Sequence, residues 1–493
     1  MKKLAVLLVA TMLLTTVLAA CGATPEPQVV KETVVVTEKE TVKETVIVTE
    51  KEEVEVTKVV KEEVEKVITA TPEPEATPLP PPEGKIIVWG WEAALNNTLE
   101  ASGVLADFQA AYPDVEVEFL IMAPQDVYTN LPLALTAGED LPDVVLVENS
   151  NLAQFVHLGG GTGLTDLTDK VAPYVDQMND YKWTDCMLDG KYYCMPWDSG
   201  PVVMYYRRDV FDAAGLPSEP EEVTKLIATW DDYLEACRTI KEETGAYCFA
   251  HNKANNWARL YEMTLWEQGL GYYELETGKV TVDSPENIAT LEMLGQFWEE
   301  DLVSDNLEWT DPWYAELGTV DLAEGPIATI VEASWMEVFM KDWIAPGTAG
   351  LWGVAYMPSV TGAGPRTAND GGSTFVIPAE APNPEAAWAF VEFALGNRDS
   401  QLKMFEVSGF IPSLETTYDD ELFDTGDDFF AKQKARQIYA DVVARIPSAG
   451  IYGPNYNMMN GAVSTAIQSF ATGEMSAEEA LQQAAEEIRA NLE

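Results

Sequence analysis

The sequence predicts an α/β protein with two lobes, which follow a low-complexity N-terminal spacer. Three observations support this fold class. Strand-like and helix-like patterns alternate from residue 85 onward, which is typical of an α/β sheet. Residues 85–493 number about 409, too many for one compact core. Residues 22–84 contain no aromatic side chain, so that segment cannot build a core of its own.

The first residues have the pattern of a secretory signal. Two lysines are followed by a mostly apolar run, residues 4–20, that ends in small residues. Threonines interrupt the run, and it is shorter than the about 20 strongly apolar residues of a spanning helix, so a transmembrane anchor is the less favoured interpretation. "LAAC" (18–21) resembles the lipobox of bacterial lipoproteins. The resemblance implies cleavage after residue 20 and acylation of Cys21. More than one acyl chain on this cysteine is needed for stable anchoring.

The spacer, residues 21–84, is dominated by Val, Thr, Glu and Lys. "KETVVVTEKETV" (31–42) recurs as "KETVIVTEKEEV" (43–54), with ten of twelve positions identical. The valines are too clustered for clean heptads, so a disordered spacer is favoured over a coiled coil. Its proline-rich end favours extended polyproline II structure. We expect this segment to hold the folded part away from the membrane.

Charge and cysteine content exclude several functions. The chain carries a net charge of -52, and residues 85–493 alone carry -46, which excludes binding to a phosphate backbone. The histidines, His157 and His251, have no clustered partners, so we expect no metal site and no cofactor. Beyond Cys21, the even number of cysteines suggests two disulfides. Three pairings are possible; those that flank short turns, Cys186 with Cys194 and Cys237 with Cys248, are favoured.

The strands and helices follow in order. "KIIVWGW" (85–91) predicts a strand buried on both faces, and strands are also expected at 115–122 and 143–147. Helices are expected before Pro113, over 127–137, from Thr229 to Thr244 and over 383–395. Thr229 is a candidate N-cap, with Asp232 at the third helical position.

Polar and aromatic side chains follow the strand ends, where open α/β sheets bind ligands. Trp91 and Glu92 follow the first strand, Glu148 and Asn149 the third, and Asp198 the segment "GKYYCMPW". Each place combines a hydrogen-bonding group with an aromatic or apolar neighbour. These residues are therefore candidates for a ligand site.

The segment "LDGKYYCMPWDSGPVVMYYRRDVFDAAGL" (188–216) resembles the hallmark of family 1 extracellular solute-binding proteins, the sugar-type receptors of ABC importers. Further matches follow the family's order and cover nearly all of 85–493: "LPDVVLV", "TWDDYLEACRTIKE", "EGPIATIVEASW", "GVAYMPSV", "GGSTFVIP", "NPEAAWAFVEFAL" and "SGFIPS". The resemblance implies a two-lobed periplasmic-binding-protein fold of the maltose-binding type (type II), in which the chain crosses between lobes three times. The crossings are expected near Asp198, Tyr356 and Gly409. Lobe 1 would then hold 85–198 and 357–408, and lobe 2 would hold 199–356 and 409–493.

The resemblance also implies a carbohydrate ligand. Sugars present apolar C–H faces and a ring of hydroxyls, so their sites combine flat aromatic rings with carboxylates or amides. Trp335 stands where the family commonly stacks an aromatic ring on a sugar, and loops around Trp257 and Tyr456 reach the cleft in relatives. The expected binding residues are Trp91, Glu92, Glu148, Asn149, Asp198, Trp257, Trp335, Gly371, Gly372, Ser373, Tyr456 and Asn457.

The resemblance implies two partners, a carbohydrate and the transmembrane subunits of an ABC permease. It also implies that the protein is a monomer, that it is lipid-anchored on the extracytoplasmic face of the cell membrane, and that it is not an enzyme. Two alternatives stay open. A lipid-anchored carbohydrate-active enzyme would need a pair of carboxyls across the scissile bond, and 67 acidic residues in 85–493 make chance pairs unavoidable. No nucleophile elbow, zinc-protease motif or P-loop is present. A surface protein that feeds a sensor is the second alternative.

Overall fold

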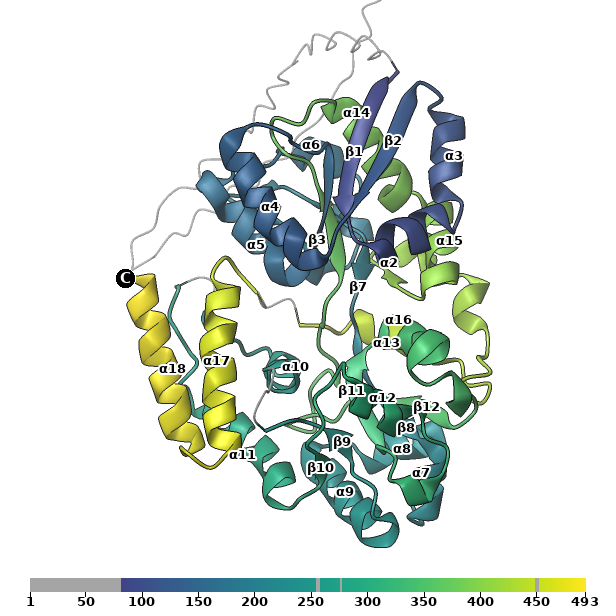
Figure 1. The fold of residues 1–493 in the computed structure, drawn as a ribbon, viewed down its shortest axis with the longest axis vertical. Helices are drawn as coiled ribbons and strands as arrows, with labels where there is room; N and C mark the ends of the chain where they lie inside the picture. Colours follow the sequence, from purple (N-terminus) through teal and green to yellow (C-terminus); the bar gives the residue numbers. More distant parts are fainter. Residues whose placement is uncertain (1–80, 254–257, 275–276, 448–451) are drawn as a thin grey trace, which may run out of the picture. The chain divides into compact units, whose positions relative to one another are not determined.

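The computed structural model describes residues 81–253, 258–274, 277–447 and 452–493. The predicted signal, Cys21 and the spacer up to residue 80 lie outside the described residues, as does Trp257. The described chain from Pro81 to Glu493 forms one compact unit. Its two main sheets lie apart in the fold (Figure 1), and a separate hydrophobic core surrounds each of them.

The first core surrounds a five-stranded sheet. Its order is β2 (Val115–Ile121), β1 (Gly84–Gly90), β3 (Val144–Glu148), β13 (Ser373–Val376) and β6 (Met195–Pro196). β1 pairs in parallel with β2 and β3, whereas β13 runs antiparallel between β3 and β6. The strands predicted at 85–91, 115–122 and 143–147 are confirmed, and β3 is buried because helices cover both faces. The helices of this lobe are α2 (Glu92–Ala94), α3 (Val104–Ala111), α4 (Pro124–Ala137), α5 (Asn149–His157), α6 (Thr168–Val171), α14 (Pro384–Val391) and α15 (Arg398–Ser408).

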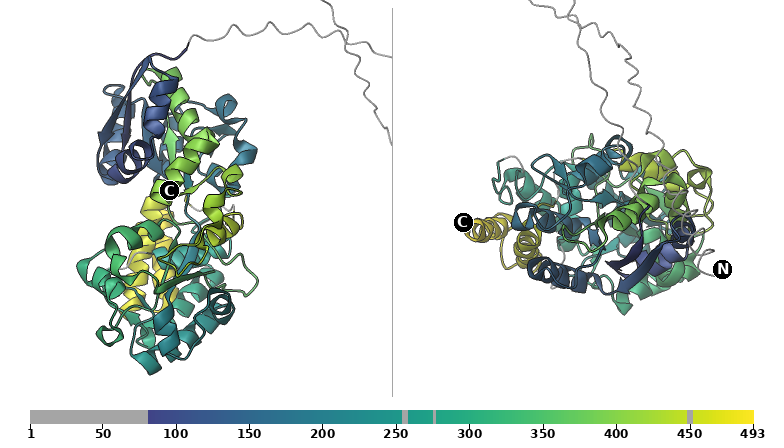
Figure 2. Two further views of the ribbon diagram at one scale, coloured as in Figure 1. Left: turned by 90° about the vertical axis from the view of Figure 1, so that its right-hand side faces the viewer. Right: turned by 90° about the horizontal axis from the view of Figure 1, so that it is seen from above.

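The second core surrounds an antiparallel sheet in the order β11 (Thr329–Ala333), β8 (Val202–Arg207) and β12 (Trp352–Ala355). The short pair β9 (Phe249–Ala250) and β10 (Val303–Ser304) lies beside it. α17 and α18 lie side by side next to α11 (Figures 1 and 2). The helices are α7 (Arg208–Ala213), α8 (Pro220–Leu226), α9 (Trp230–Thr244), α10 (Arg259–Glu267), α11 (Pro285–Glu299), α12 (Asp311–Gly318), α13 (Met336–Phe339), α16 (Ala435–Val443), α17 (Tyr456–Ala471) and α18 (Ala477–Leu492).

The predicted cap of α9 is confirmed. The Thr229 hydroxyl accepts a hydrogen bond from the Asp232 amide, and the Asp232 carboxylate accepts one from the Thr229 amide. This reciprocal arrangement satisfies two amides that the helix itself leaves without partners. It begins α9 at Trp230, whose indole lies in the second core.

Three segments connect the two cores. β7 (Asp198–Ser199) pairs with β14 (Ile411–Pro412), which places the first and last connections side by side. Met357 and Ala368 still pack in the second core, whereas β13 belongs to the first. We therefore place the middle crossing at 369–372, later than the expected position near Tyr356. The reason is Arg366, whose guanidinium donates to carbonyls of the second lobe and ties 357–368 to it.

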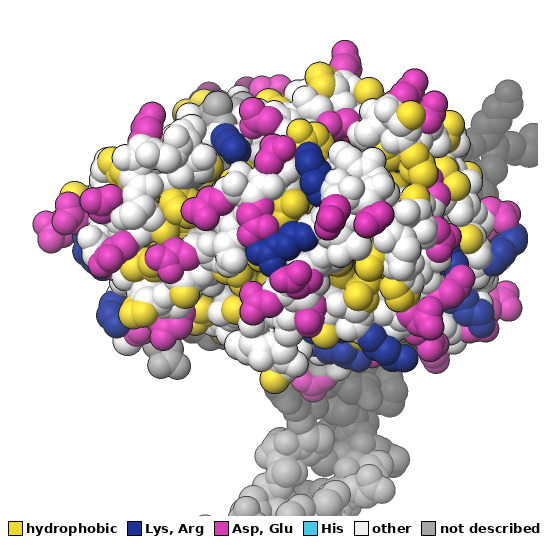
Figure 3. All heavy atoms as spheres, turned by 90° about the horizontal axis from the view of Figure 1, so that it is seen from below, with side chains coloured by type: hydrophobic (Ala, Val, Ile, Leu, Met, Phe, Trp, Pro, Cys, Tyr) yellow, Lys and Arg dark blue, Asp and Glu magenta, His cyan; other side chains and the backbone are white. Residues whose placement is uncertain are grey.

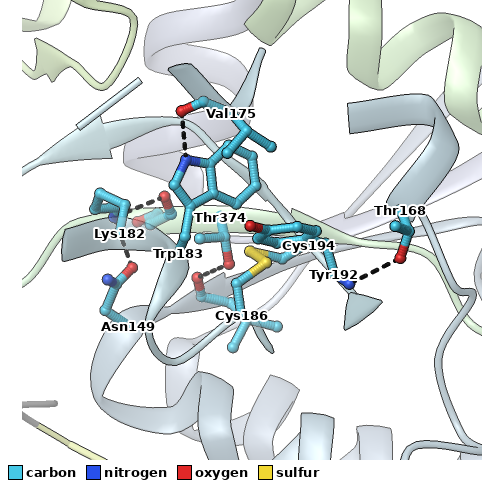
Figure 4. The surroundings of a disulfide bond; sticks show 11 residues. Asn149, Thr168, Val175, Lys182, Trp183, Cys186, Tyr192, Cys194 and Thr374 are labelled. Atoms are coloured by element: carbon cyan, nitrogen blue, oxygen red, sulfur yellow. Dashed lines mark hydrogen bonds between the residues drawn. A yellow bond between two sulfur atoms is a disulfide. The ribbon is translucent and has the colours of Figure 1, made fainter. Parts of the chain in front are cut away.

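The structure pairs Cys186 with Cys194 and Cys237 with Cys248, which confirms the favoured disulfides. The first closes the hairpin of β4 (Met187–Leu188) and β5 (Lys191–Tyr192), and the second joins α9 to the start of β9. Figure 4 shows the first disulfide among Trp183 and Tyr192. Each bridge therefore constrains a short local loop.

Acidic side chains are spread over the face drawn in Figure 3, with Lys and Arg side chains among them. The net negative charge of the sequence is therefore not gathered in one patch on this face. Among the described residues no helix is both long and apolar enough to cross a membrane.

Candidate ligand-binding site

A cavity of about 350 Å³ lies where the two lobes and their connections meet. Its lining comes from the ends of β1 and β3, from the start of α10 and α13, and from the three crossings. The lining residues are Trp91, Ala93, Ala94, Pro124, Glu148, Trp197, Asp198, Arg259, Trp309, Trp335, Phe339, Gly371, Gly372, Ser373 and Phe410. This volume is in the range of small-molecule sites.

Aromatic rings form much of the cavity wall. Trp335 is the N-cap residue of α13, and its ring centroid lies 5.9 Å from that of Trp309 and 5.7 Å from that of Phe339. The Trp335 indole N–H donates to the Asp370 carbonyl over 2.9 Å, which fixes the ring while leaving it half-buried. Trp91 lines the cavity from the first lobe. The cavity therefore presents flat apolar surfaces from both lobes.

Two carboxylates share the cavity with these rings. Glu148 ends β3, and its Oε2 accepts a hydrogen bond from the Tyr128 hydroxyl over 3.3 Å. Burial raises the Glu148 pKa, and the negative charge of Asp370 raises it further. Asp198 begins the first crossing, and its Oδ1 accepts from the Ser373 amide over 2.7 Å. Burial also raises the Asp198 pKa, while the nearby Lys182 opposes that shift.

Lys182 is a buried ammonium beneath the crossings. Its Nζ donates to the Asn149 side-chain oxygen over 2.6 Å and to the Ser373 carbonyl over 3.2 Å (Figure 4). Burial lowers the Lys182 pKa to about 8. These two hydrogen bonds link the end of β3 to the start of β13, and so they position the cavity residues Glu148 and Ser373.

Arg259 is the cation of the cavity wall. Its guanidinium lies 5.0 Å from the Trp335 ring centroid and pairs with Asp370 and with Glu332, the latter at 3.2 Å. Glu308 lies nearby, and burial raises its pKa to about 7. The carboxylates exceed the cations around this wall, so the cavity is an unfavourable place for an anionic ligand.

Glycines let the middle crossing approach its neighbours. Gly372 has φ +84°, and a Cβ there would stand 2.7 Å from the Asp198 carbonyl oxygen and 2.8 Å from Lys182 Nζ. Gly371 has φ +77°, with the Trp335 indole nitrogen 3.3 Å from where its Cβ would be. A side chain at either position would push the crossings apart, because the left-handed backbone and the close contact both favour glycine.

Seven predicted site residues line the cavity: Trp91, Glu148, Asp198, Trp335, Gly371, Gly372 and Ser373. Their contact with a ligand stays a prediction.

Four others lie elsewhere in the structure. Glu92 is exposed and accepts a hydrogen bond from Asn96, and Asn149 is buried against Lys182. The Tyr456 hydroxyl donates to Glu262 over 2.9 Å, so the ring belongs to a buried polar cluster of the second lobe. The Asn457 amide donates to Asn151 over 2.8 Å, which joins α17 to α5 across the lobes.

Sequence reasoning missed several lining residues. Phe339 stands four residues after Trp335, so helical spacing alone could have placed both on one face. Trp197 directly precedes Asp198 and shares its strand-end position. Arg259, Trp309 and Phe410 come from loop or helix positions that carry no periodic signal. The other missed residues are Ala93, Ala94 and Pro124.

Two α/β lobes, three crossings and an aromatic cavity between them define a two-lobed binding protein. The chain belongs to the bacterial extracellular solute-binding protein family, whose family model matches residues 103–436. It is 26% identical over 389 residues to the lactose-binding protein of Rhizobium radiobacter, covering 78% of this chain and 86% of that protein. It is 28% identical to the arabinooligosaccharide-binding protein of Halalkalibacterium halodurans, covering 74% of this chain and 80% of that protein.

Solved structures show the same fold. A family 1 extracellular solute-binding protein superposes with a TM-score of 0.71 at 22% identity, covering 82% of this chain and 99% of the other. The binding protein of B. animalis subsp. lactis Bl-04, solved with β-1,6-galactobiose, gives a TM-score of 0.64 at 24% identity over 82% of this chain and 97% of the other. Together with solved structures of maltose-binding proteins, they confirm the predicted periplasmic-binding-protein fold of the maltose-binding type.

Proposed function

We propose that this chain is the substrate-binding lipoprotein of an ABC importer, which captures a carbohydrate between its lobes and delivers it to a membrane permease. The observation that carries the proposal is the interlobe cavity, in which half-buried indoles face carboxylates. Indole faces suit the apolar C–H faces of a sugar ring, and carboxylate oxygens accept hydrogen bonds from its hydroxyls. The relatives named for lactose and arabino-oligosaccharides support the same class of ligand.

The residues that line the cavity are divided between the two lobes, and this division is the basis for capturing a sugar by closure. Trp91 and Glu148 belong to the first lobe, whereas Trp335 and Arg259 belong to the second. A sugar that contacts both sets has a higher affinity for the closed arrangement than for any state in which the lobes stand apart. It therefore shifts the population toward closure by that difference in affinity.

The cavity favours a neutral ligand. Glu148 and Asp198 face it directly, and the charge of Arg259 is already balanced by Asp370 and Glu332. A phosphate or uronate would add a negative charge beside carboxylates with no free cation in the described lining to receive it. The proposed ligand is an uncharged saccharide.

Anchoring is proposed through Cys21. The apolar run and "LAAC" motif support acylation there, and the spacer of residues 22–84 would separate the lobes from the membrane. Labelling with an alkyne-bearing fatty acid would test this: the wild-type chain should be labelled, and a Cys21→Ala variant should not. A labelled Cys21→Ala variant would contradict the assignment.

A thermal-shift screen tests the function. The chain without its first 21 residues would be measured with lactose, maltose, β-1,6-galactobiose, arabino-oligosaccharides and glycerol 3-phosphate, and any hit recovered for product analysis. A ligand at 100 times its Kd should stabilise the fold by about 2.7 kcal/mol. A neutral sugar that stabilises the wild type, is recovered intact and no longer stabilises a Trp335→Ala variant supports the proposal. Turnover of the sugar would replace it with the enzyme interpretation, and a response to no carbohydrate would reject it.

A further inference from the structure

Three aromatic residues lead from the cavity to the surface. Trp335, Phe339 and Trp343 stand four residues apart along α13 and the π-helical turn that continues it, Met340–Ile344. Consecutive ring centroids are 5.7 and 6.0 Å apart. The first two rings line the cavity, and the third does not. We name these three residues the aromatic track.

The outer end of the track is open to solvent. Trp343 is 50% exposed, and one of its neighbours is Tyr314 of α12, whose ring lies 5.0 Å away in an edge-on arrangement. Because it continues an apolar cavity wall, this half-exposed indole offers a flat apolar face to a ligand that extends out of the cavity. Asp342, the preceding residue, is also exposed.

The inner end of the track is held by a strained residue. Trp309 has φ +61°, a left-handed conformation that is rare for a bulky side chain. Its ring lies within 6 Å of both Trp335 and Phe339, at 5.9 and 5.8 Å. Backbone strain of this kind persists where surrounding structure enforces it and clusters at ligand sites. The conformation places the Trp309 ring beside the two rings of the track that line the cavity.

We infer that the aromatic track is an outer subsite and that the ligand is an oligosaccharide, with inner units in the cavity and outer units against Phe339 and Trp343. This inference rests on the proposed function and specifies its ligand class. Trp343 lies eight helical positions after Trp335, a distance along the helix on the order of 10 Å. A ligand that contacts both rings must therefore be longer than a single sugar ring.

The test measures affinity against ligand length. Isothermal titration would compare arabino-, galacto- and malto-oligosaccharides of two to six units on the wild type, Trp343→Ala and Trp343→Phe. We expect the affinity of the wild type for the recognised series to rise with length, and Trp343→Ala to lose roughly twofold to tenfold for the longer members only. Trp343→Phe should retain part of the gain. Leu492→Ala, another exposed apolar side chain, is the matched control and should change nothing.

The outcomes separate the two proposals. Equal binding of short and long members by the wild type, or an undiminished length effect in Trp343→Ala, would overturn the outer subsite while leaving carbohydrate binding intact. An equal loss for disaccharides and longer members would also overturn it, because it would show that Trp343 acts on the cavity itself. If no saccharide binds the wild type, the proposed function fails and the subsite fails with it.

Discussion

Replacing Arg259 by Met should destabilise the protein far more than removing an exposed arginine. The Arg259 guanidinium balances Asp370 and Glu332, whose side chains are only 12% and 2% exposed. Removing one partner of a buried ion pair leaves an uncompensated charge and typically costs about 3 to 5 kcal/mol. Arg238 is the matched control, because it pairs with Glu235 and Glu300 at the surface, where such pairs contribute about 1 kcal/mol or less.

The loss should depend on pH. Burial raises the pKa of Glu332 well above its ordinary value and that of Glu308 to about 7, and in both cases Arg259 opposes the shift. A carboxyl with a raised folded-state pKa lowers stability as pH rises from its unfolded value through the folded one. Without Arg259 this effect grows. The Arg259→Met variant should therefore lose most stability above about pH 7 and recover part of it near pH 5.

Urea denaturation at pH 5, 6.5 and 8 would measure the free energy of unfolding of the wild type, Arg259→Met and Arg238→Met. Adding Glu332→Gln to Arg259→Met should restore part of the loss, because it removes the stranded charge. A loss no larger than that of Arg238→Met at pH 8, or one that is equal at pH 5 and pH 8, would refute the reasoning.

Three further predictions concern the fold and the crossings. Burial lowers the His251 pKa to about 3, so the folded state loses stability as pH falls below about 6.5. Melting curves should show that, between pH 6.5 and pH 4, His251→Phe loses about 3 kcal/mol less stability than the wild type does. Replacing Cys237 and Cys248 by Ser should lower the urea-measured stability by about 3 kcal/mol, since the bridge spans 11 residues, and an unchanged midpoint would contradict this. Gly372→Ala should destabilise the fold and weaken sugar binding in titrations, whereas Gly103→Ala, with a similar φ but open space around it, should affect stability alone.

The sequence indicated the fold more completely than the site. Continuous apolar runs predicted β1 and β3, because strands buried on both faces need no polar alternation. Thr229 and Asp232 predicted the start of α9, because capping is a local interaction. Short turns between cysteines favoured the observed disulfides for the same reason.

Site residues were harder to predict because tertiary partners decide where a side chain goes. Asn149 follows a strand end as a ligand residue would, yet Lys182, 33 residues later, takes its amide oxygen. Tyr456 is likewise held by Glu262, from a helix 194 residues away. Trp309 lines the cavity from a left-handed backbone conformation, which no local sequence pattern predicts. Positions of this kind depend on contacts between segments that are distant in sequence.

The place of β13 in the first sheet determines when that sheet can be completed as the chain is made. β13 inserts between β3 and β6, and its Thr374 hydroxyl donates to the Val147 carbonyl across 227 positions of the chain. Until residue 376 has been synthesised, the apolar strand β3 has no β13 to pair with at that edge. Such an edge can pair with another chain, and closing so long a loop is slow. The N-terminal lobe, although its first strands are synthesised early, therefore completes its sheet only after most of the second lobe has been synthesised.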